Sequence, residues 1–396
     1  MRVLVTSSRM PFALAIIRKL AAQGHEVLAA DAWEVSPGSH SRYVAEHFVT
    51  PSPRDATEAF VADVERIAAE RRVDLIVPAF EEVFYLSTRW DRLARVTKPF
   101  FSRFGTLLPL HDKESFQRFA TGLGLPMART VVARSDPELR EALGRFERYF
   151  ARAAFSRGGV ALLTNAGPLA GRVAVADCHP TPTNPWLVQE FVEGETFCTY
   201  STVHDGYVTA HCAYAIPRQW QHSTGIQFRS IDGAVTLEIV ERIAAETAYT
   251  GQVSFDFIDS PDGPYLVECN PRATDGALLM SAPQLASGLL EPTGQCETVP
   301  AGEEIQLDLA VFGGMFDGGQ IPGTFHDLLH IRGADRGWHD ALPNLYSFLS
   351  LVRSERLRHA EHSELFVAMA GDISWDGEEI TGMSEEDARV LAGARG

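Results

Sequence analysis

The prediction of the fold starts from GQVSFDFIDSPDGPYLVECNPR, residues 251–272. This stretch contains two runs rich in β-branched and aromatic residues, 253–258 and 265–270, which are typical of strands. Residues 261–263 (PDG) lie between them and suit a three-residue hairpin loop with Gly in the left-handed conformation. The stretch therefore predicts a β-hairpin.

One face of this hairpin is expected to carry polar side chains. If Ser260 and Pro264 flank the loop, residues pair outward from them across the two strands. This register puts Asp256 directly opposite Glu268, and Asn270 lies two residues further along the same face. Two facing carboxylates repel each other and contribute nothing to the stability of the hairpin. The other face is expected to belong to the core and carries Phe255, Phe257, Tyr265 and Val267.

A divalent cation would remove the repulsion between Asp256 and Glu268. Two carboxylates and the amide carbonyl of Asn270 are hard oxygen ligands, which suit Mg²⁺ held together with substrate phosphates. Arg272 follows the second strand and would direct a planar guanidinium at the same phosphates. Because the carboxylates repel, Glu268→Gln is expected to leave stability undiminished when no metal is present. The alternative, a hairpin with a solvated acidic face, stays open on these residues alone.

The chain has 396 residues, which suggests two or three domains, and its formal net charge is −17. So acidic a chain argues against nucleic acid or an anionic membrane as the main partner, although a local basic pocket for a nucleotide is compatible with it. Its five cysteines include no C-x-x-C pair, so neither a disulfide framework nor a zinc site is indicated. With no signal peptide and no long apolar run, a soluble, cytoplasmic protein is expected.

The first hundred residues alternate between strand and helix patterns. Residues 2–6, 26–30 and 73–78 predict short buried strands, and residues 11–23 and 55–70 predict helices between them. This order predicts a parallel, doubly wound sheet of the Rossmann-like type.

Two features lie where such a sheet binds ligands. The turn TSSRMP after the first strand lacks G-x-G-x-x-G, which argues against a dinucleotide. Glu81 and Glu82 follow the third strand at its carboxyl end. They are candidates for substrate contact, and they are equally compatible with carboxylates that complement a helix dipole.

A second unit begins near residue 111 and carries further cations. Lys113 falls in the first turn of a predicted helix, where a cation is unfavourable for the dipole, so it points to a bound anion. Arg152 is an isolated charge in an apolar strand. The small residues and the cation that follow it suit a phosphate-covering loop, although a Gly-Gly turn is also common in hairpins. This loop consists of Ser156, Arg157, Gly158 and Gly159.

Residues 186–203 read as a strand, a short linker and a second strand. Glu190 and Glu195 lie on either side of Gly194, and such a segment can offer backbone groups to a purine and a carboxylate to a ribose. Without its context it is equally well two edge strands and a turn.

Taken in order, these features resemble the ATP-grasp superfamily over roughly residues 1–300, with E-x-N-P-R after a D-F strand as the most specific motif. The resemblance implies an α/β Rossmann-like pre-ATP-grasp domain (1–110) and a two-lobed α+β ATP-grasp domain (111–301). A mobile glycine-loop lobe is expected at about 128–192. A small extension, 302–396, would complete or cap the ATP-grasp domain. There, His326 and His330 have helical i,i+4 spacing, yet no third metal ligand is apparent.

The resemblance also implies roles for the site residues. Lys113 and Arg152 would bind phosphates while the loop of Ser156, Arg157, Gly158 and Gly159 closes over the triphosphate. Adenine would meet Glu190, Phe191 and Val192, and ribose would meet Glu195. Mg²⁺ or Mn²⁺ would be held by Asp256, Glu268 and Asn270. Most members have Lys at the position of Arg152, and members similar to the carbamoyl-phosphate synthetase large subunit have Arg.

The function implied is that of an ATP-dependent carboxylate–amine ligase that acts through an acyl phosphate and releases ADP and phosphate. Arg272 and Arg152 would be the catalytic cations. The expected partners are a small carboxylic acid and an amine, such as amino acids, and a homodimer is also expected. Two alternatives stay open: another ATP-grasp reaction through carboxyphosphate, giving carboxylation or carbamoyl-type chemistry, and a nucleotide-binding protein without turnover.

Overall fold

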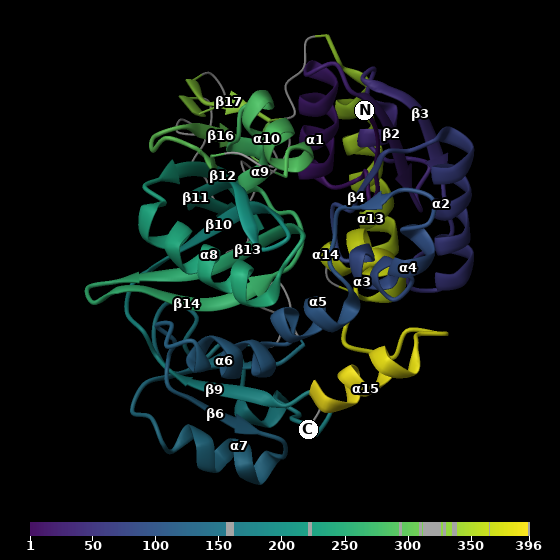
Figure 1. Ribbon diagram of the computed structural model, residues 1–396. Coiled ribbons are helices and arrows are strands. Elements are labelled where there is room, and N and C mark those ends of the chain that lie inside the picture. The colour runs from purple at the N-terminus through teal and green to yellow at the C-terminus, as the bar shows by residue number, and fades with distance from the viewer. Residues whose placement is uncertain are drawn as a thin grey trace.

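The computed structural model describes residues 1–155, 162–220, 224–292, 295–308, 311, 326–327, 330–334, 339–363 and 365–394. Three β-sheets organise this part of the chain, and we name them the front, small and central sheets (Figure 1). None of the helices that it describes is long and apolar enough to cross a lipid bilayer.

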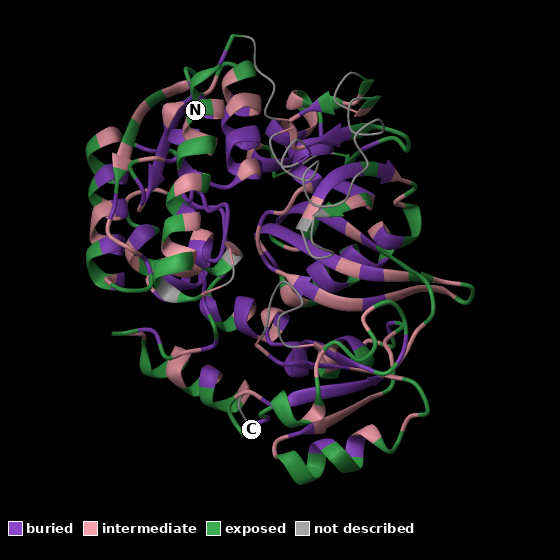
Figure 2. Ribbon diagram, turned by 180° about the vertical axis from the view of Figure 1, so that it is seen from behind, coloured by how far each residue is buried: buried purple, intermediate pink, exposed green. Residues whose placement is uncertain are grey.

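The front sheet is parallel throughout and has the strand order β3-β2-β1-β4-β5. Helices cover both of its faces: Val3 and Val5 pack with helix α1 (Pro11–Ala22), whereas Leu4 packs with α2 (Thr57–Arg71). Because neither face meets water, β1, β2 and β4 are almost continuously buried (Figure 2). The predicted doubly wound sheet is therefore confirmed. Its strands are β1 (Arg2–Val5), β2 (Glu26–Asp31), β3 (Val44–Val49), β4 (Leu75–Val77) and β5 (Lys98–Pro99).

Short helices lead from the front sheet to the second unit. The first of them, α3 (Glu82–Ser87), begins at Glu82, which agrees with a helix N-terminus next to the carboxylates of Glu81 and Glu82. After α4 (Trp90–Leu93), helix α5 (Phe104–His111) runs directly into α6 (Lys113–Gly122). Asp112 separates the two helices, and its side chain accepts a hydrogen bond from the Ser115 amide at 2.9 Å. This N-cap fixes Lys113 as the first residue of α6.

The small sheet is antiparallel, with the order β6-β9-β7-β8, and α7 (Asp136–Leu143) packs on it. Its strands are β6 (Thr130–Ala133), β7 (Tyr149–Ala153), β8 (Leu162–Thr164) and β9 (Trp186–Glu190). Together with the central sheet it gives the two lobes that were expected, so the predicted fold class, α/β followed by α+β, is confirmed.

The central sheet has the order β14-β13-β10-β11-β12-β16-β17, and β15 pairs with β11. It is antiparallel except for the short strands β15 and β17. Helix α8 (Ala234–Thr247) contributes to one core cluster, and α9 (Gly276–Leu279) and α10 (Ala282–Leu290) contribute to another. The strands are β10 (Glu195–His204), β11 (Tyr207–Trp220), β12 (Thr224–Ile231), β13 (Gly251–Ser260), β14 (Gly263–Asn270), β15 (Glu297–Thr298), β16 (Glu304–Gln306) and β17 (Arg332–Gly333).

The hairpin of β13 and β14 differs from the prediction in its turn. Ser260 pairs with Gly263, so the loop has two residues rather than three. A β-bulge at Val267 then shifts the register by one residue, and Asp256 lies opposite Glu268 as predicted. The bulge also corrects the expected core face: Leu266 is buried, whereas Tyr265 and Val267 are only half-buried.

The C-terminal residues are shared between two parts of the molecule. Strand β16 joins the central sheet, whereas α13 (Leu342–Glu361) runs beside the front domain (Figure 1). Tyr346 of α13 stacks on His40 with ring centroids 3.4 Å apart. The chain then continues through α14 (Leu365–Ala370) and the short 3₁₀ turn η3 (Gly371–Ile373) to α15 (Glu385–Ala394), which contacts α5. The role assigned to 302–396 stays a prediction.

Gly194 holds the linker between β9 and β10 against β13. Its φ is +155°, and a Cβ added there would lie 2.1 Å from the carbonyl oxygen of Asp259. We expect Gly194→Ala to lower the free energy of unfolding by about 1–3 kcal/mol, because backbone has to move. Urea denaturation measures this change. Gly122→Ala in α6 is the control, because its added methyl meets open space; an equal loss in both variants would contradict the explanation.

Candidate functional site

Three segments that are far apart in the sequence meet at the polar face of the hairpin. Arg152 from β7 reaches across from the small sheet to β14 of the central sheet. Its Nη1 donates to Oε2 of Glu268 at 2.6 Å, and its Nη2 donates to the backbone carbonyl of Val267 at 2.8 Å. The bulge that turns this carbonyl toward Arg152 is the same one that restores the pairing of Asp256 with Glu268.

Lys113 brings a second cation to the same carboxylate. Its Nζ lies 3.7 Å from Oε2 of Glu268 and donates to the carbonyl oxygen of Ala154 at 3.3 Å. Lys113 and Arg152 are only 8% and 7% exposed. Water therefore solvates these two charges poorly, and they need an anionic partner. In this structure that partner is Glu268.

The two facing carboxylates differ in their electrostatics. Burial would raise the pKa of Glu268, but Lys113 and Arg152 outweigh it and lower that pKa to about 2. Burial and the negative charge of Glu268 raise the pKa of Asp256 to about 7, although a hydrogen bond with Cys198 opposes the rise. Of the two carboxylates, Asp256 is therefore the one whose negative charge is less well stabilised.

Asn270 and Arg272 extend the site toward the front domain. The amide nitrogen of Asn270 lies 3.5 Å from Oε1 of Glu268, and its oxygen accepts from Nη2 of Arg272 at 3.2 Å. The guanidinium of Arg272 lies over the ring of Phe80, and its Nε forms an ion pair with Glu81 at 3.4 Å. Arg272 thus bridges the hairpin and the carboxyl end of β4.

This donor set fits a hard divalent cation such as Mg²⁺. The observation that supports the fit is the raised pKa of Asp256, because a cation between two facing carboxylates would offset both burial and repulsion. Within the part of the chain that the structure describes, no group of three His, Cys, Asp or Glu side chains forms a metal site. A metal ion on Asp256 and Glu268 would therefore need Asn270 or phosphate oxygens to complete its ligands.

The residues predicted to meet adenine and ribose lie on the strand ends between the two lobes. Glu190, at the end of β9, forms a bidentate pair with Arg129, with both N–O distances 2.7 Å. Phe191 lies under the guanidinium of Arg148, and Glu195 is exposed at the start of β10. Among the described residues, no hydrogen bond or ion pair joins this group to Asp256 or Glu268. The group consists of Glu190, Phe191, Val192 and Glu195.

The predicted phosphate loop cannot be compared with the structure. Ser156, Arg157, Gly158 and Gly159 lie outside the described residues. The residue before them, Phe155, has both its backbone N–H and its backbone carbonyl hydrogen-bonded to the side-chain amide of Asn184. Its N–H donates to Oδ1 of Asn184 at 2.9 Å, and its carbonyl accepts from Nδ2 of Asn184 at 3.3 Å.

Glu81 and Glu82, which were equivalent in the sequence, have different environments. Glu82 is fully buried and accepts hydrogen bonds from Thr6 Oγ1 and from two amides of the loop after β4, so it stabilises that loop. Glu81 pairs with Arg272 and accepts from the amide of Trp375 at 3.0 Å. Glu81 therefore belongs to the site, and Glu82 supports it.

Two further residues of this region were missed by the sequence reasoning. Asp275 follows the E-x-N-P-R motif, and burial raises its pKa to about 7 against the opposing charge of Arg272. Its position shortly after the motif was a usable signal. Trp375 lies 294 residues from Glu81 in the sequence, and no local pattern connects the two.

Comparisons with known proteins agree with this geometry at the level of the fold. No protein-family model matches the sequence, and a search of curated proteins gives no match. Among solved structures, N5-carboxyaminoimidazole synthetase from Staphylococcus aureus, complexed with ADP, matches with a TM-score of 0.60 at 10% identity, over 80% of this chain and 85% of that one. Phosphoribosylamine–glycine ligase from Thermotoga maritima matches with 0.56 at 17% identity, over 77% and 78%. L-amino acid ligase from Bacillus licheniformis matches with 0.51 at 13% identity, over 70% and 68%.

The chain has the ATP-grasp fold. The parallel front sheet followed by two antiparallel lobes is the arrangement it shares with these structures. At such identities the likeness concerns the fold, so the roles of individual residues and the finer likeness to the carbamoyl-phosphate synthetase large subunit stay predictions.

Because the two carboxylates have different pKa values, we expect neutral substitutions of Asp256 and Glu268 to change the thermal stability of the metal-free protein in opposite directions. The folded-state pKa of Asp256 is raised from 3.8 to about 7, so stability falls as pH rises through that window and the full penalty remains at pH 8. We expect Asp256→Asn to raise the Tm at pH 8 but not at pH 3.5. Glu268→Gln should lower the Tm at pH 8, because it leaves two buried cations without their anion. This reverses the expectation drawn from the sequence.

Thermal unfolding in EDTA at the two pH values measures both effects. Asp259→Asn is the matched control, because Asp259 lies on the same hairpin with its side chain exposed. A higher Tm for Glu268→Gln than for the unmodified protein would contradict the pairing of Glu268 with Lys113 and Arg152.

Proposed function

We propose that this protein is an ATP-dependent carboxylate–amine ligase, which joins a small carboxylic acid to an amine and releases ADP and phosphate. The observation that carries the proposal is the shared contact of Arg152 and Lys113 with Oε2 of Glu268, directly opposite Asp256. Two buried cations and two carboxylates, brought together from three segments, form a cluster suited to a polyphosphate and a divalent cation.

The charge balance of this cluster supports the proposal. Without a ligand, Glu268 pairs with both cations, and Asp256 keeps its raised pKa. A triphosphate would offer Arg152 a bidentate partner and Lys113 a more strongly charged one. Glu268 would then be free to bind Mg²⁺ together with Asp256. A bound Mg²⁺ would supply further neutralisation of phosphate charge.

The chemistry requires activation of the acid. A carboxylate oxygen attacks the γ-phosphorus of ATP, the bond from that phosphorus to the bridging oxygen breaks, and ADP leaves with the electron pair. The amine then attacks the carbonyl carbon of the acyl phosphate, loses a proton and expels phosphate. The protein aligns the groups and stabilises charge. The ion pair with Glu81 holds the guanidinium of Arg272 at the carboxyl end of β4, where open α/β sheets bind ligands. Arg272 would orient the acid substrate there.

One observation favours a second function, an ATP-grasp reaction through carboxyphosphate. N5-carboxyaminoimidazole synthetases are among the matching structures, and a biotin carboxylase from Campylobacter jejuni also matches, with a TM-score of 0.56. In that reaction bicarbonate would take the place of the acid. ADP and phosphate would again be the products.

The bond that breaks provides the test. We expect turnover with pairs of amino acids to release ADP and orthophosphate, and one ¹⁸O atom of a labelled acid carboxylate to appear in the phosphate. Label that comes from bicarbonate instead would support the second function. AMP and pyrophosphate, or unlabelled phosphate formed along with the product, would contradict the acyl-phosphate mechanism. Asp256→Asn under the same conditions reports the background from contaminating ATPases.

Arg152 offers a test of the phosphate contact. We expect Arg152→Lys to weaken ADP binding a few-fold, because it keeps the charge and loses the planar fork. Arg152→Ala should weaken it about 10- to 100-fold, as expected for the loss of a charge-assisted hydrogen bond. Titration calorimetry with Mg²⁺ present measures both. Arg145→Ala removes an exposed arginine from the same lobe and is the control; equal affinity in all four proteins would make Arg152 a structural residue.

A further inference from the structure

The segment 369–378, which we name the C-terminal strap, lies against the carboxyl end of the front sheet and contacts residues that follow β1, β3 and β4. Salt bridges fasten it to the front domain. The guanidinium of Arg9 binds the two carboxylate oxygens of Asp372 at 2.7 and 3.0 Å, and Arg54 pairs with Asp376 at 2.7 Å. Arg9 is itself fixed by Asp31 at the end of β2. The strap is therefore anchored to the carboxyl end of the front sheet.

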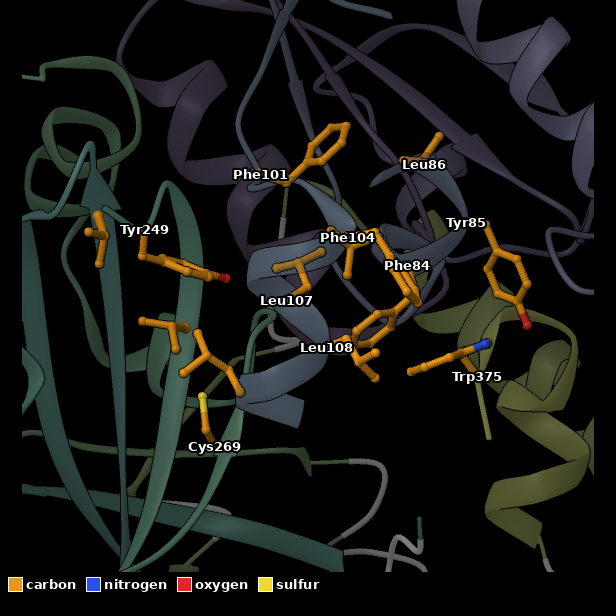
Figure 3. Close-up of a cluster of buried hydrophobic side chains, with 14 of the residues drawn as sticks. Phe84, Tyr85, Leu86, Phe101, Phe104, Leu107, Leu108, Tyr249, Cys269 and Trp375 are labelled. Carbon is orange, nitrogen blue, oxygen red and sulfur yellow. The ribbon is translucent and has the colours of Figure 1, made fainter. Parts of the chain in front are cut away.

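Trp375 inserts its side chain from the strap into the interior of the molecule. Its side chain is fully buried, and its Nε1 donates to the carbonyl of Glu378 at 2.8 Å. The ring packs on Phe84 of α3, with centroids 4.7 Å apart, and on Phe104 of α5, at 5.5 Å. Figure 3 shows Trp375 pointing from the strap toward these two rings. It thus joins the front domain to the helix that leads into the ATP-grasp lobes.

The same ring packs near sequence neighbours of both residues that form the hydrogen bond between Lys113 and Ala154. Its centroid lies 5.9 Å from that of His111, two residues before Lys113. It lies 5.7 Å from the ring of Phe155, which follows Ala154, the carbonyl acceptor of Lys113. Because Gly377 has no side chain, the strap can lie close to Phe155: a Cβ at Gly377 would lie 2.8 Å from the Phe155 ring.

The backbone of Trp375 is connected to a second cation of the site, Arg272. Its N–H donates to Oε2 of Glu81 at 3.0 Å, and Oε1 of Glu81 pairs with Nε of Arg272 at 3.4 Å. One residue of the strap is therefore connected to Lys113 through its ring and to Arg272 through its amide. A residue that only filled the core would need neither connection.

We propose that Trp375 is a positioning residue of the candidate nucleotide site: its ring holds His111 and Phe155, and through them the placement of Lys113 against the hairpin. The identity of the ligand rests on the proposed function, whereas the positioning itself does not. The C-terminal strap is then part of the site rather than a peripheral extension. A purely structural Trp375 would affect stability alone.

The experiment compares Trp375→Leu, Trp375→Phe and the control Phe60→Leu. Phe60 is a buried aromatic residue of α2, among the side chains that cover the front sheet. Hydrogen exchange without any ligand is measured over residues 111–118 and 149–155, and ADP affinity is measured by calorimetry with Mg²⁺ present. We expect Trp375→Leu to lose protection in both segments and to bind ADP at least tenfold more weakly. Trp375→Phe should restore most of both, and Phe60→Leu should change neither.

Each outcome decides the proposal. Unchanged exchange in Trp375→Leu would overturn it, because the ring would then not hold His111 and Phe155. Altered exchange with unaltered ADP affinity would overturn the link to the nucleotide. An equal loss of affinity in Phe60→Leu would reduce Trp375 to a stabilising residue. If the unmodified protein binds no ADP, the proposed function and the link to the nucleotide both fail, and the exchange data alone still decide whether Trp375 positions Lys113.

Discussion

A single carboxylate oxygen, Oε2 of Glu268, forms ion pairs with both Arg152 and Lys113. Each residue comes from a different element: Glu268 from the central sheet, Arg152 from the small sheet and Lys113 from α6. Removing one partner of a buried ion pair leaves an uncompensated charge, so this contact ties the two lobes together. A ligand that draws the cations away from Glu268 necessarily alters the contact between the lobes.

Alternation along two strands was enough to predict the pairing of Asp256 with Glu268. The turn and the bulge could not be predicted, because two offsetting changes, a loop shorter by one residue and an extra residue at Val267, leave the same register. The bulge directs a backbone carbonyl to Arg152, more than a hundred residues away. Local pattern carries no information about such a tertiary contact. For the same reason the sequence treated the two carboxylates as equivalent, whereas distant cations make them unlike.

The different environments of Glu81 and Glu82 show a second limit of prediction from the sequence. Both follow β4, and either could have faced a ligand. Their roles separate because Glu82 turns inward to Thr6 and the loop amides, whereas Glu81 meets Arg272 and the strap. The partners of Glu81 come from the hairpin and from the C-terminus, so they are known only once the domains are assembled. Sequence order predicted the ATP-grasp fold well because each of its motifs is local.

The charge of the whole chain constrains how a nucleotide would reach this site. A protein with a net charge of −17 repels a free triphosphate at long range, and its cations at the site are buried and already paired. A nucleotide complexed with Mg²⁺ carries less negative charge and meets less repulsion. It also brings the cation that Asp256 and Glu268 lack, and its phosphates bring the anion that Arg152 and Lys113 require. Under the proposed function, the exchange of partners is therefore favoured most when metal and nucleotide bind together.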